Sequence, residues 1–512
     1  MLLLSSIRGL RWLTFVALSV AVISQASMLR GAELAGSKPN IILIITDDQG
    51  YGDLACHGNP VIKTPQLDKL HSESARFTDF HVSPTCAPTR SAVLTGRHEF
   101  FNGVTHTIQE RERLRLDAVT LPTVLKEAGY TTAIFGKWHL GDEPEYWPNK
   151  RGYDEMFIHG CGGIGQSYPG TCGDAPGNKY TNPVINHNGK LVATEGYCTD
   201  VFFKQAQTWI DKKRQEKQPF YLQITTNAPH APYIVPKKYS DVYEGKVPPE
   251  TAKFYGMIAN IDENVGALRD KLKEWKLEEN TLLIFMTDNG SAAGEKVFNA
   301  GMRGKKGTPF LGGTRVPSFW YLPERIAAGE ITATTAHIDI FPTLAELAGA
   351  QLPTAVQQQI QGRSLVPLLK QRDATWSDRY LVTHVGRWEA GLDVANAKPG
   401  EAKYSNGSIR WRNYHAVRAG KNAAKGWELF DVTADPGESR DIADMHPDIV
   451  KQLDADYDRW WAAVVPNMVN ETAAATAAKN KLTPYKKLYW NQFRGPGPNN
   501  VPPPEGFEFA KE

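Results

Sequence analysis

The stretch Ile41-Ile42-Leu43-Ile44-Ile45-Thr46-Asp47-Asp48 decides the fold class of this 512-residue chain. Its first five residues are apolar and mostly β-branched, which is typical of a strand buried on both faces. A second run of this character, Leu282-Leu283-Ile284-Phe285-Met286, ends in Thr287-Asp288-Asn289-Gly290. Such strands favour a parallel sheet covered by helices, in which ligands bind beyond the carboxyl ends of the strands. The sequence therefore predicts an α/β domain with a site at one edge of its sheet.

Acidic and amide side chains follow both strands. Asp47, Asp48, Asp288 and Asn289 offer only hard oxygen ligands, which favour calcium or magnesium over zinc or copper. The alternative is two ordinary strand-to-loop turns rich in Asp and Asn. The same Thr-Asp-Asp/Asn pattern at both strand ends favours the metal site.

Two further strand patterns end in basic residues. The strand predicted at 132–135 leads into Lys137 and His139, and the strand predicted at 220–225 leads into His230. Histidine is the usual acid–base catalyst near neutral pH, and lysine can stabilise a developing anion. A lone histidine is more often structural, but polar clusters at four strand ends indicate an active site.

The segment Cys86-Ala87-Pro88-Thr89-Arg90 places a thiol four residues before an arginine. Pro84 and Pro88 predict that Cys86 lies on a rigid loop and not in a helix. The guanidinium of Arg90 suits a tetrahedral oxyanion such as sulfate or phosphate. A buried structural cysteine is the alternative.

Helical patterns alternate with these strands. The clearest helix has apolar residues at three- and four-residue steps from Phe254 to Trp275. The alternation predicts a large mixed, mostly parallel sheet sandwiched by helices over residues 38–370. Short strand patterns and a helix near 447–464 predict a smaller C-terminal α+β subdomain over 371–466, followed by an extended Pro/Gly-containing tail over 467–512. Other helices are predicted at 64–80, 200–212 and 338–348.

The N-terminal residues resemble an export signal. Arg8 and Arg11 precede the apolar run 12–23, which predicts a signal peptide over residues 1–26 and a secreted or periplasmic protein. A membrane anchor is the alternative, but the run is shorter than the roughly 20 residues that a spanning helix needs. Without these two arginines, the 58 Lys and Arg residues balance the 56 Asp and Glu residues. This balance argues against a nucleic-acid partner and against stable membrane insertion.

Four cysteines remain besides Cys86, namely Cys56, Cys161, Cys172 and Cys198. In an oxidising compartment they could form two disulfides, and at least one is predicted within residues 161–198. A zinc site is the competing idea, but the spacings lack the close pairs of zinc motifs.

These motifs and their order resemble the type I, formylglycine-dependent sulfatases, which are arylsulfatase-like members of the alkaline-phosphatase-like superfamily. The resemblance covers most of the chain after the predicted signal peptide. The segments that carry it are 38–40, 47–53, 64–70, 86–90, 94–97, 136–139, 229–230, 287–290, 306–308, 312–317, 428–431 and 435–436.

The resemblance implies a nucleophile and a metal ion. A formylglycine-generating enzyme would oxidise Cys86 to formylglycine (3-oxoalanine), whose hydrated aldehyde is a gem-diol. One hydroxyl would attack the sulfur and expel the alcohol, and deprotonation of the other would eliminate sulfate. The metal would be Ca²⁺, with Mg²⁺ as the alternative, and its ligands would be Asp47, Asp48, Cys86, Asp288 and Asn289.

The resemblance also implies roles for five basic residues. Arg90 would support the formylglycine, Lys137 would contact sulfate oxygens, and His139 would assist elimination. His230 and Lys306 would attend the leaving-group oxygen. Lys305 is adjacent to Lys306, and the Gly-Thr that follows favours Lys306.

Three other segments need weighing. Leu311 stands where the family commonly has a glutamate, which puts the polar contacts of that loop in doubt. The segment 160–165 has a dinucleotide-binding spacing but no matching helix or acidic partner, so it is interpreted as a glycine-rich loop near the mouth of the site. The charged stretch 111–115 could line an entrance for an anionic polymer, but its mixed signs favour a solvated strand or loop.

Three functions remain open. The first is a secreted sulfatase that hydrolyses sulfate esters, with sulfated carbohydrates as the expected substrates. The second is a phosphonate monoester or phosphodiester hydrolase of the same superfamily. The third is a non-catalytic binder of sulfated glycans, against which the intact set of candidate catalytic residues argues.

Overall fold

The computed structural model describes residues 34–109, 111–168, 172–388, 402–468 and 488. The predicted signal peptide lies outside these residues, as does the predicted tail apart from residues 467, 468 and 488. Over the described ranges, no helix is long and apolar enough to cross a membrane.

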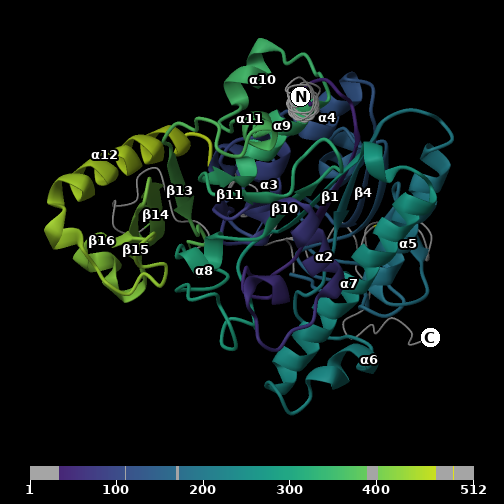
Figure 1. Cartoon of the computed structure of the whole chain (residues 1–512), viewed down its shortest axis with the longest axis horizontal. Helices are drawn as coiled ribbons and strands as arrows, with labels where there is room; N and C mark the ends of the chain where they lie inside the picture. Colours follow the sequence, from purple (N-terminus) through teal and green to yellow (C-terminus); the bar gives the residue numbers. More distant parts are fainter. Residues whose placement is uncertain (1–33, 110, 169–171, 389–401, 469–487, 489–512) are drawn as a thin grey trace, which may run out of the picture.

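A ten-stranded sheet forms the centre of the described chain (Figure 1). Its five central strands run parallel in the order β9 (Thr281–Thr287), β1 (Asn40–Thr46), β8 (Phe220–Thr225), β4 (Thr131–Lys137) and β5 (Glu155–His159). Antiparallel strands join at both sides, so the sheet is mixed and mostly parallel at its centre, which confirms the predicted fold class. The outer strands are β10 (Ser318–Tyr321), β2 (Ala75–Phe77) and β11 (Gly329–Ile331) beyond β9, and β6 (Val184–His187) and β7 (Lys190–Ala193) beyond β5.

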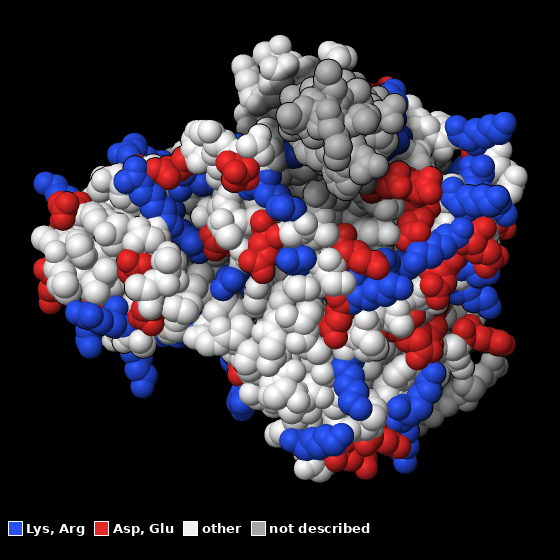
Figure 2. Space-filling view, viewed as in Figure 1, with Lys and Arg blue, Asp and Glu red and all other residues white. Residues whose placement is uncertain are grey.

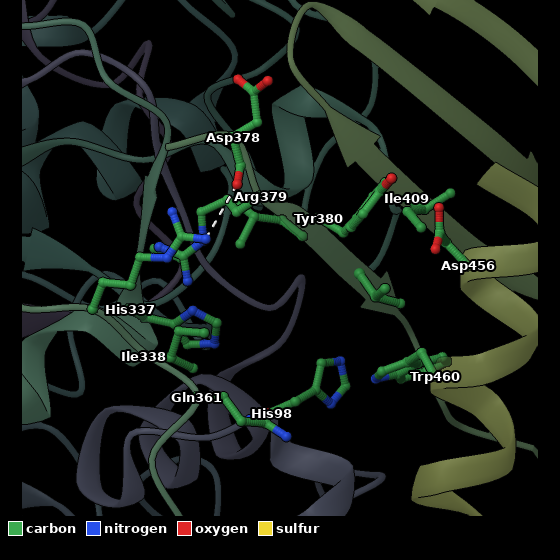
Figure 3. A pocket seen from close by; sticks show the side chains of 14 residues that line it. His98, His337, Ile338, Gln361, Asp378, Arg379, Tyr380, Ile409, Asp456 and Trp460 are labelled. Atoms are coloured by element: carbon green, nitrogen blue, oxygen red, sulfur yellow. Dashed lines mark hydrogen bonds between the residues drawn. The ribbon is translucent and has the colours of Figure 1, made fainter. Parts of the chain in front are cut away.

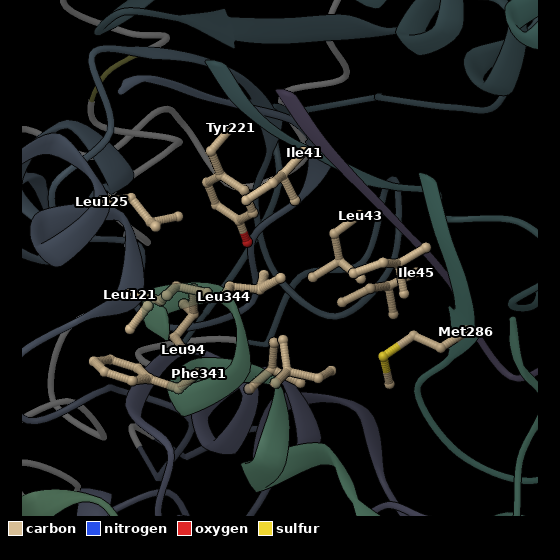
Figure 4. Close-up of a cluster of buried hydrophobic side chains, with 14 of the residues drawn as sticks. Ile41, Leu43, Ile45, Leu94, Leu121, Leu125, Tyr221, Met286, Phe341 and Leu344 are labelled. Carbon is tan, nitrogen blue, oxygen red and sulfur yellow. The ribbon is translucent and has the colours of Figure 1, made fainter. Parts of the chain in front are cut away.

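Helices cover both faces of this sheet, as the apolar strands predict. Ile41, Leu43 and Ile45 of β1 enter one core, which Figure 4 shows, and Ile42 and Ile44 enter the core on the other face. All five side chains are fully buried, which explains why β1 contains no polar residue between Asn40 and Thr46. The first core packs on α3 (Cys86–Thr95), α4 (Leu121–Glu127), α9 (Ile340–Leu347) and α11 (Val366–Lys370), and the second on α2 (Pro65–Glu73), α5 (Cys198–Lys213) and α7 (Pro249–Glu274).

The predicted helices are largely present. The stripe from Phe254 lies in α7 and is buried against the sheet, and the helices predicted at 200–212 and 338–348 correspond to α5 and α9. The outer surfaces of α5 and α7, on the right of Figure 2, carry interspersed basic and acidic side chains.

The helix predicted over 64–80 is too long, because α2 ends at Glu73. Ser74 takes an extended conformation, and its hydroxyl donates to the carbonyl of Leu70. Residues 75–77 then pair with β10 and β11, so the hydrogen bonds of the sheet outweigh the local helical pattern.

A second, antiparallel sheet follows in the C-terminal part, on the left of Figure 1. Its strands are β13 (Tyr380–His384), β14 (Asn406–Trp411), β15 (Tyr414–Ala419) and β16 (Glu428–Asp431). Leu453 and Tyr457 of α12 (Pro447–Val464) pack on Ile409 and Leu429 of this sheet. The other short strands and α-helices of the described residues are β3 (Phe80–His81), α6 (Lys237–Ser240), α8 (Leu311–Thr314), β12 (Thr335–Ala336) and α10 (Thr354–Gln359).

Candidate active site

The candidate residues meet at the carboxyl ends of the central strands. Asp47 follows β1, Asp288 follows β9, Lys137 ends β4 and His230 lies shortly after β8. These four strands are neighbours and parallel, so their carboxyl ends share one edge of the sheet. The strand order therefore brings residues from four distant parts of the sequence into one site.

Oxygen atoms and the Cys86 thiol form the deepest part of this site. One ligand atom from each of Asp47, Cys86 and Asp288 lies within 4.8 Å of the others, and all three residues are buried. The backbone N–H of Asp48 donates to Asp288 Oδ1 at 3.1 Å, and Asn289 Nδ2 donates to Asp48 Oδ1 at 3.0 Å. These contacts join the two strand ends that the sequence predicted to converge.

Two oxygens of this cluster fit a cation. Asp47 Oδ1 and Asn289 Oδ1 are buried and have no hydrogen-bond partner. Burial raises the pKa of Asp47, and burial together with the nearby Asp47 raises the pKa of Asp288. A buried carboxylate near another carboxylate is unfavourable unless positive charge is close. Calcium prefers such oxygen donors, so the residues present fit a Ca²⁺ ion.

Three cations surround the three carboxylates. Lys137 is hydrogen-bonded to Asp47, Arg90 Nη2 donates to Asp288 Oδ2 at 2.8 Å, and Lys306 Nζ donates to Asp48 Oδ2 at 2.6 Å. Burial alone would raise the pKa of Asp48, but the ammonium group of Lys306 holds this pKa well below its usual range. The cluster therefore places three basic groups beside three carboxyl groups before a metal ion or an anionic substrate enters.

Cys86 lies in a helix, and the predicted loop is wrong. It is the first residue of α3, and Pro88 is the third. Proline fits there because its fixed φ suits a helix and because N–H groups of the first turn have no partner within the helix. Burial raises the pKa of the Cys86 thiol, so this side chain is a neutral thiol at neutral pH. The N-terminus of α3 carries partial positive charge, which favours an anion such as sulfate beside Cys86.

Both candidate histidines are held by backbone carbonyls. His139 Nε2 lies 2.7 Å from the carbonyl oxygen of Thr107, and His230 Nδ1 lies 2.6 Å from that of Ala231. A carbonyl accepts only, so each of these nitrogens donates its proton. Burial lowers the pKa of both rings, to about 4 for His230, so both are neutral. His139 Nδ1, buried without a partner, is then left free to accept a proton.

A cavity of about 270 Å³ opens over this cluster. Cys86, His139, His230 and Lys306 line it, together with His106, Thr107, Ile108, Gly162, Gln166, Tyr168 and Arg387. None of these lining residues is acidic, so the wall of the cavity suits an anionic substrate. Gly162 belongs to the glycine-rich loop that the sequence placed near the mouth of the site.

Several lining residues were not predicted from the sequence. His106, Gln166, Tyr168 and Arg387 belong to loops without a regular pattern, and nothing in the sequence signals their position. The choice of Lys306 over Lys305 agrees with the geometry, because Lys305 is exposed and pairs with Glu295 at 3.1 Å.

The charged stretch 111–115 begins with buried residues, so the expectation of a solvated strand or loop is wrong for them. Arg111, Glu112 and Arg113 are each at most 3% exposed. Arg111 Nη1 donates to the carbonyl of Trp388 at 2.6 Å, and its guanidinium lies 4.3 Å from the centre of the Trp388 ring. Arg111 Nε donates to Thr105 Oγ1 at 3.0 Å. This arginine therefore fastens the segment around Trp388 to a loop of the cavity wall.

A glutamate from the C-terminal part contacts the loop in which Leu311 departs from the family pattern. The N–H of Leu311 donates to Glu438 Oε2 at 2.8 Å, and His415 Nδ1 lies 2.7 Å from Glu438 Oε1. Arg303 Nη1 donates to the Glu438 carbonyl at 3.1 Å. Glu438 thus links the C-terminal sheet to the loop that carries Lys306.

Replacing Glu438 by alanine is expected to lower the free energy of unfolding by about 3 kcal/mol, because the buried N–H of Leu311 and His415 both lose their partner. A lower Tm by differential scanning calorimetry checks this. Glu438→Gln, which retains an acceptor, is expected to lose less, and the exposed Glu244→Ala is the control. An unchanged Tm for Glu438→Ala would contradict the proposed link.

All five cysteines are free thiols in the structure. The sulfur atoms of Cys161 and Cys172 lie 2.7 Å apart, and both residues are buried. A disulfide within residues 161–198 stays a prediction, and this pair is the one whose sulfur atoms are in contact.

The sequence model of the sulfatase family matches residues 39–350, more than half of the chain. The chain belongs to the sulfatase family. A second family model, for the C-terminal part of N-sulphoglucosamine sulphohydrolase, matches residues 310–459.

Individual relatives of this sulfatase cover most of its length. Mouse arylsulfatase J is 30% identical over 455 residues, which span 81% of this chain and 75% of the relative. Human N-acetylgalactosamine-6-sulfatase is 31% identical over 371 residues, 67% of each chain. The solved structure of Ps i-CgsB in complex with k-i-k-neocarrahexaose has a TM-score of 0.74 and 27% identity, and the match covers 86% of this chain and 96% of that one. The predicted family is confirmed, and the chain is a sulfuric ester hydrolase.

Proposed function

We propose that this sulfatase removes sulfate from esters on a carbohydrate, with residue 86 as formylglycine and Ca²⁺ as the metal ion. Asp47, Asp48, Asp288, Asn289 and residue 86 would hold the ion. The observation that carries the proposal is the buried cluster of Asp47, Cys86 and Asp288 beneath a cavity with no acidic lining residue. Calcium would supply positive charge to the sulfate and to the buried carboxylates.

The residues of the chain have separate tasks in this proposal. Formylglycine, once hydrated, supplies the oxygen nucleophile that a thiol does not. Lys137 and Arg90 hold negative charge at the base of the site, where both are buried and hydrogen-bonded to carboxylates. His139 accepts a proton through its unpartnered Nδ1 when sulfate is eliminated.

Lys306 and His230 attend the leaving oxygen. Both residues line the cavity, and both lie beside Asp48. Asp48 Oδ2 is 2.6 Å from Lys306 Nζ and 3.7 Å from His230 Nε2. An ammonium group at this place stabilises the negative charge that develops on the leaving oxygen.

The choice of a carbohydrate substrate is supported by the relatives. One is named N-acetylgalactosamine-6-sulfatase, and the i-CgsB structure contains k-i-k-neocarrahexaose. We further propose export through the signal peptide at 1–26, maturation by a formylglycine-generating enzyme, and the division into units 38–370, 371–466 and a tail.

The test uses the converted enzyme, in which Cys86 has been oxidised to formylglycine. It compares sulfate release from an aryl sulfate with cleavage of the matched aryl phosphodiester. A higher kcat/KM for the sulfate supports the proposal. A higher value for the phosphodiester would favour the phosphodiester hydrolase, and no turnover of any sulfate ester by the aldehyde form would favour the glycan binder.

Lys306→Ala is expected to lower kcat by about 100-fold, because the leaving oxygen loses its cationic partner. The loss is expected to grow as the leaving alcohol becomes less acidic, which a series of substituted aryl sulfates measures. Lys305→Ala is the matched control, since Lys305 is exposed and lies outside the cavity lining. Equal losses in the two variants, or a loss independent of the leaving group, would contradict the role.

A further inference from the structure

We propose that Arg387 binds a second anionic group of the substrate, so that the preferred substrate is a glycan with at least two anionic groups. This inference rests on the proposed function of the cavity. Sulfate and carboxylate, the anionic groups that would distinguish such glycans, both suit a guanidinium fork. Arg387 follows β13, so the C-terminal part of the chain would contribute to substrate selection.

Arg387 is the cation of the cavity wall whose charge is not used within the described structure. Its side chain is exposed, and its Nη2 donates to Thr107 Oγ1 at 3.3 Å. Among the described residues, no carboxylate forms an ion pair with it. Lys306, the other cation of the lining, is paired with Asp48 at 2.6 Å. A guanidinium has five N–H donors, so Arg387 can bind a ligand without breaking an internal ion pair.

A second cavity contains two arginines that are hydrogen-bonded to a carboxylate or to backbone carbonyls of the protein. Figure 3 shows this cavity of about 390 Å³, whose lining includes His337, His98 and Trp460. Its Arg379 donates to both oxygens of Asp339 at 2.8 and 2.7 Å, and its Arg363 donates to the carbonyls of Ser377 and Asp378. Arg379 is thus paired with a carboxylate and Arg363 with two carbonyls, whereas Arg387 has one longer hydrogen bond, to Thr107 Oγ1 at 3.3 Å.

The backbone around Arg387 is held in one conformation. Gly386 and Arg387 both have positive φ, at 64° and 60°. A Cβ on Gly386 would lie 2.0 Å from the carbonyl oxygen of Thr105, so only glycine fits there. The N–H of Arg387 donates to that oxygen at 3.2 Å, and the N–H of Gly386 donates to His384 Nδ1 at 2.8 Å.

Arg111 also holds the segment 386–388 in place. It donates to the carbonyl of Trp388 and to Thr105 Oγ1, so it joins the segment 386–388 to the loop that contains Thr107. A positive φ at a non-glycine residue is unfavourable and persists only where the surroundings enforce it. The fold therefore fixes the position from which the Arg387 side chain reaches the cavity.

The charges of the wall point to the substrate class. The sulfate to be cleaved belongs at the base, near Cys86, Lys137 and the N-terminus of α3. Arg387 lies on the wall of the same cavity of about 270 Å³, with no acidic residue among the other lining residues. A substrate with one anionic group would leave this guanidinium without an anionic partner among the described residues, whereas a second anionic group would pair with it.

The experiment measures kcat and KM of the converted enzyme and of Arg387→Ala and Arg387→Lys. The substrates are a monosulfated disaccharide, the disulfated disaccharide of the same sugars, a monosulfated disaccharide with a uronic acid, and an aryl sulfate. In Arg387→Ala, the ratio of kcat/KM for the disulfated to the monosulfated disaccharide is expected to fall by about 10- to 100-fold. The fall is expected mainly in KM, because the contact is made equally in the ground state and the transition state.

The other substrates identify the second anionic group, and the other variants exclude a purely structural effect. If Arg387→Ala lowers kcat/KM only for the uronic acid substrate, the second group is a carboxylate. If it lowers kcat/KM only for the disulfated substrate, the second group is a sulfate. Arg387→Lys is expected to recover part of the ratio, and Arg363→Ala, at the second cavity, to leave it unchanged.

Two results would overturn the inference. One is an equal loss of Arg387→Ala on all four substrates, which would indicate a purely structural residue. The other is a wild-type enzyme that cleaves the monosulfated and aryl substrates but whose kcat/KM is no higher for the substrates with a second anionic group. Failure of the proposed function itself is recognised separately, as a wild-type enzyme with an aldehyde at residue 86 and no sulfate release from any substrate.

Discussion

Replacing Cys86 by alanine is expected to lower kcat for an aryl sulfate by about 10⁴-fold or more, because the nucleophile of the proposed reaction forms on this side chain. Cys86 is 2% exposed and begins α3. Alanine is smaller and favours helices, so the variant is expected to fold and to keep most of its Tm. Kinetics of the two proteins, with their Tm values, check the prediction.

Cys198 offers a matched control for this substitution. It is fully buried and is the first residue of α5, as Cys86 is of α3, but it lies outside the cavity lining. Cys198→Ala is expected to keep its kcat within about threefold, with a modest cost in stability. Sulfate release by Cys86→Ala at the wild-type rate would show that the nucleophile is another group.

Removing the divalent cation is expected to lower kcat by about 100-fold or more and to lower Tm. The reason is that Asp47 and Asp288 are buried close together, with Asp47 Oδ1 lacking any partner. Dialysis against a chelator, with metal content measured, followed by titration of Ca²⁺ and of Mg²⁺, tests both effects. Calcium is expected to restore both kcat and Tm.

Two aspartate variants localise that cation. Asp47→Asn is expected to lose the rise of Tm on adding Ca²⁺, because it removes a charged ligand. Asp142→Asn is the control: Asp142 is equally buried, and burial raises its pKa to about 8, so it is already largely neutral at pH 7. A protein with full activity after complete removal of divalent metal would contradict the proposed centre.

The sequence predicted the parts of the site that depend on strand ends. Asp47 and Asp288 each follow an unbroken apolar run, and parallel neighbouring strands must bring such residues to one edge. The same reasoning located Lys137 and His230. This success follows from regular geometry, because the period of a strand and the direction of a parallel sheet are visible in the sequence.

Residues that depend on tertiary contacts were predicted poorly. Pro88 suggested a loop at Cys86, but proline is equally suited to the first turn of a helix, which local sequence does not distinguish. The charge of Arg111 suggested solvent exposure, whereas its partners Thr105 and Trp388 bury it. From the C-terminal part, Arg387 lines the cavity and Glu438 binds the N–H of Leu311, and no local pattern reveals such long-range contacts.

The most direct test of the central claim relates activity to the state of residue 86. Preparations made with different amounts of a formylglycine-generating enzyme are analysed by mass spectrometry of the peptide that contains residue 86, and their sulfate release is measured in the presence of Ca²⁺. The account predicts that specific activity is proportional to the aldehyde fraction and extrapolates to zero for the thiol form. Full activity in a preparation whose residue 86 is entirely thiol would contradict it.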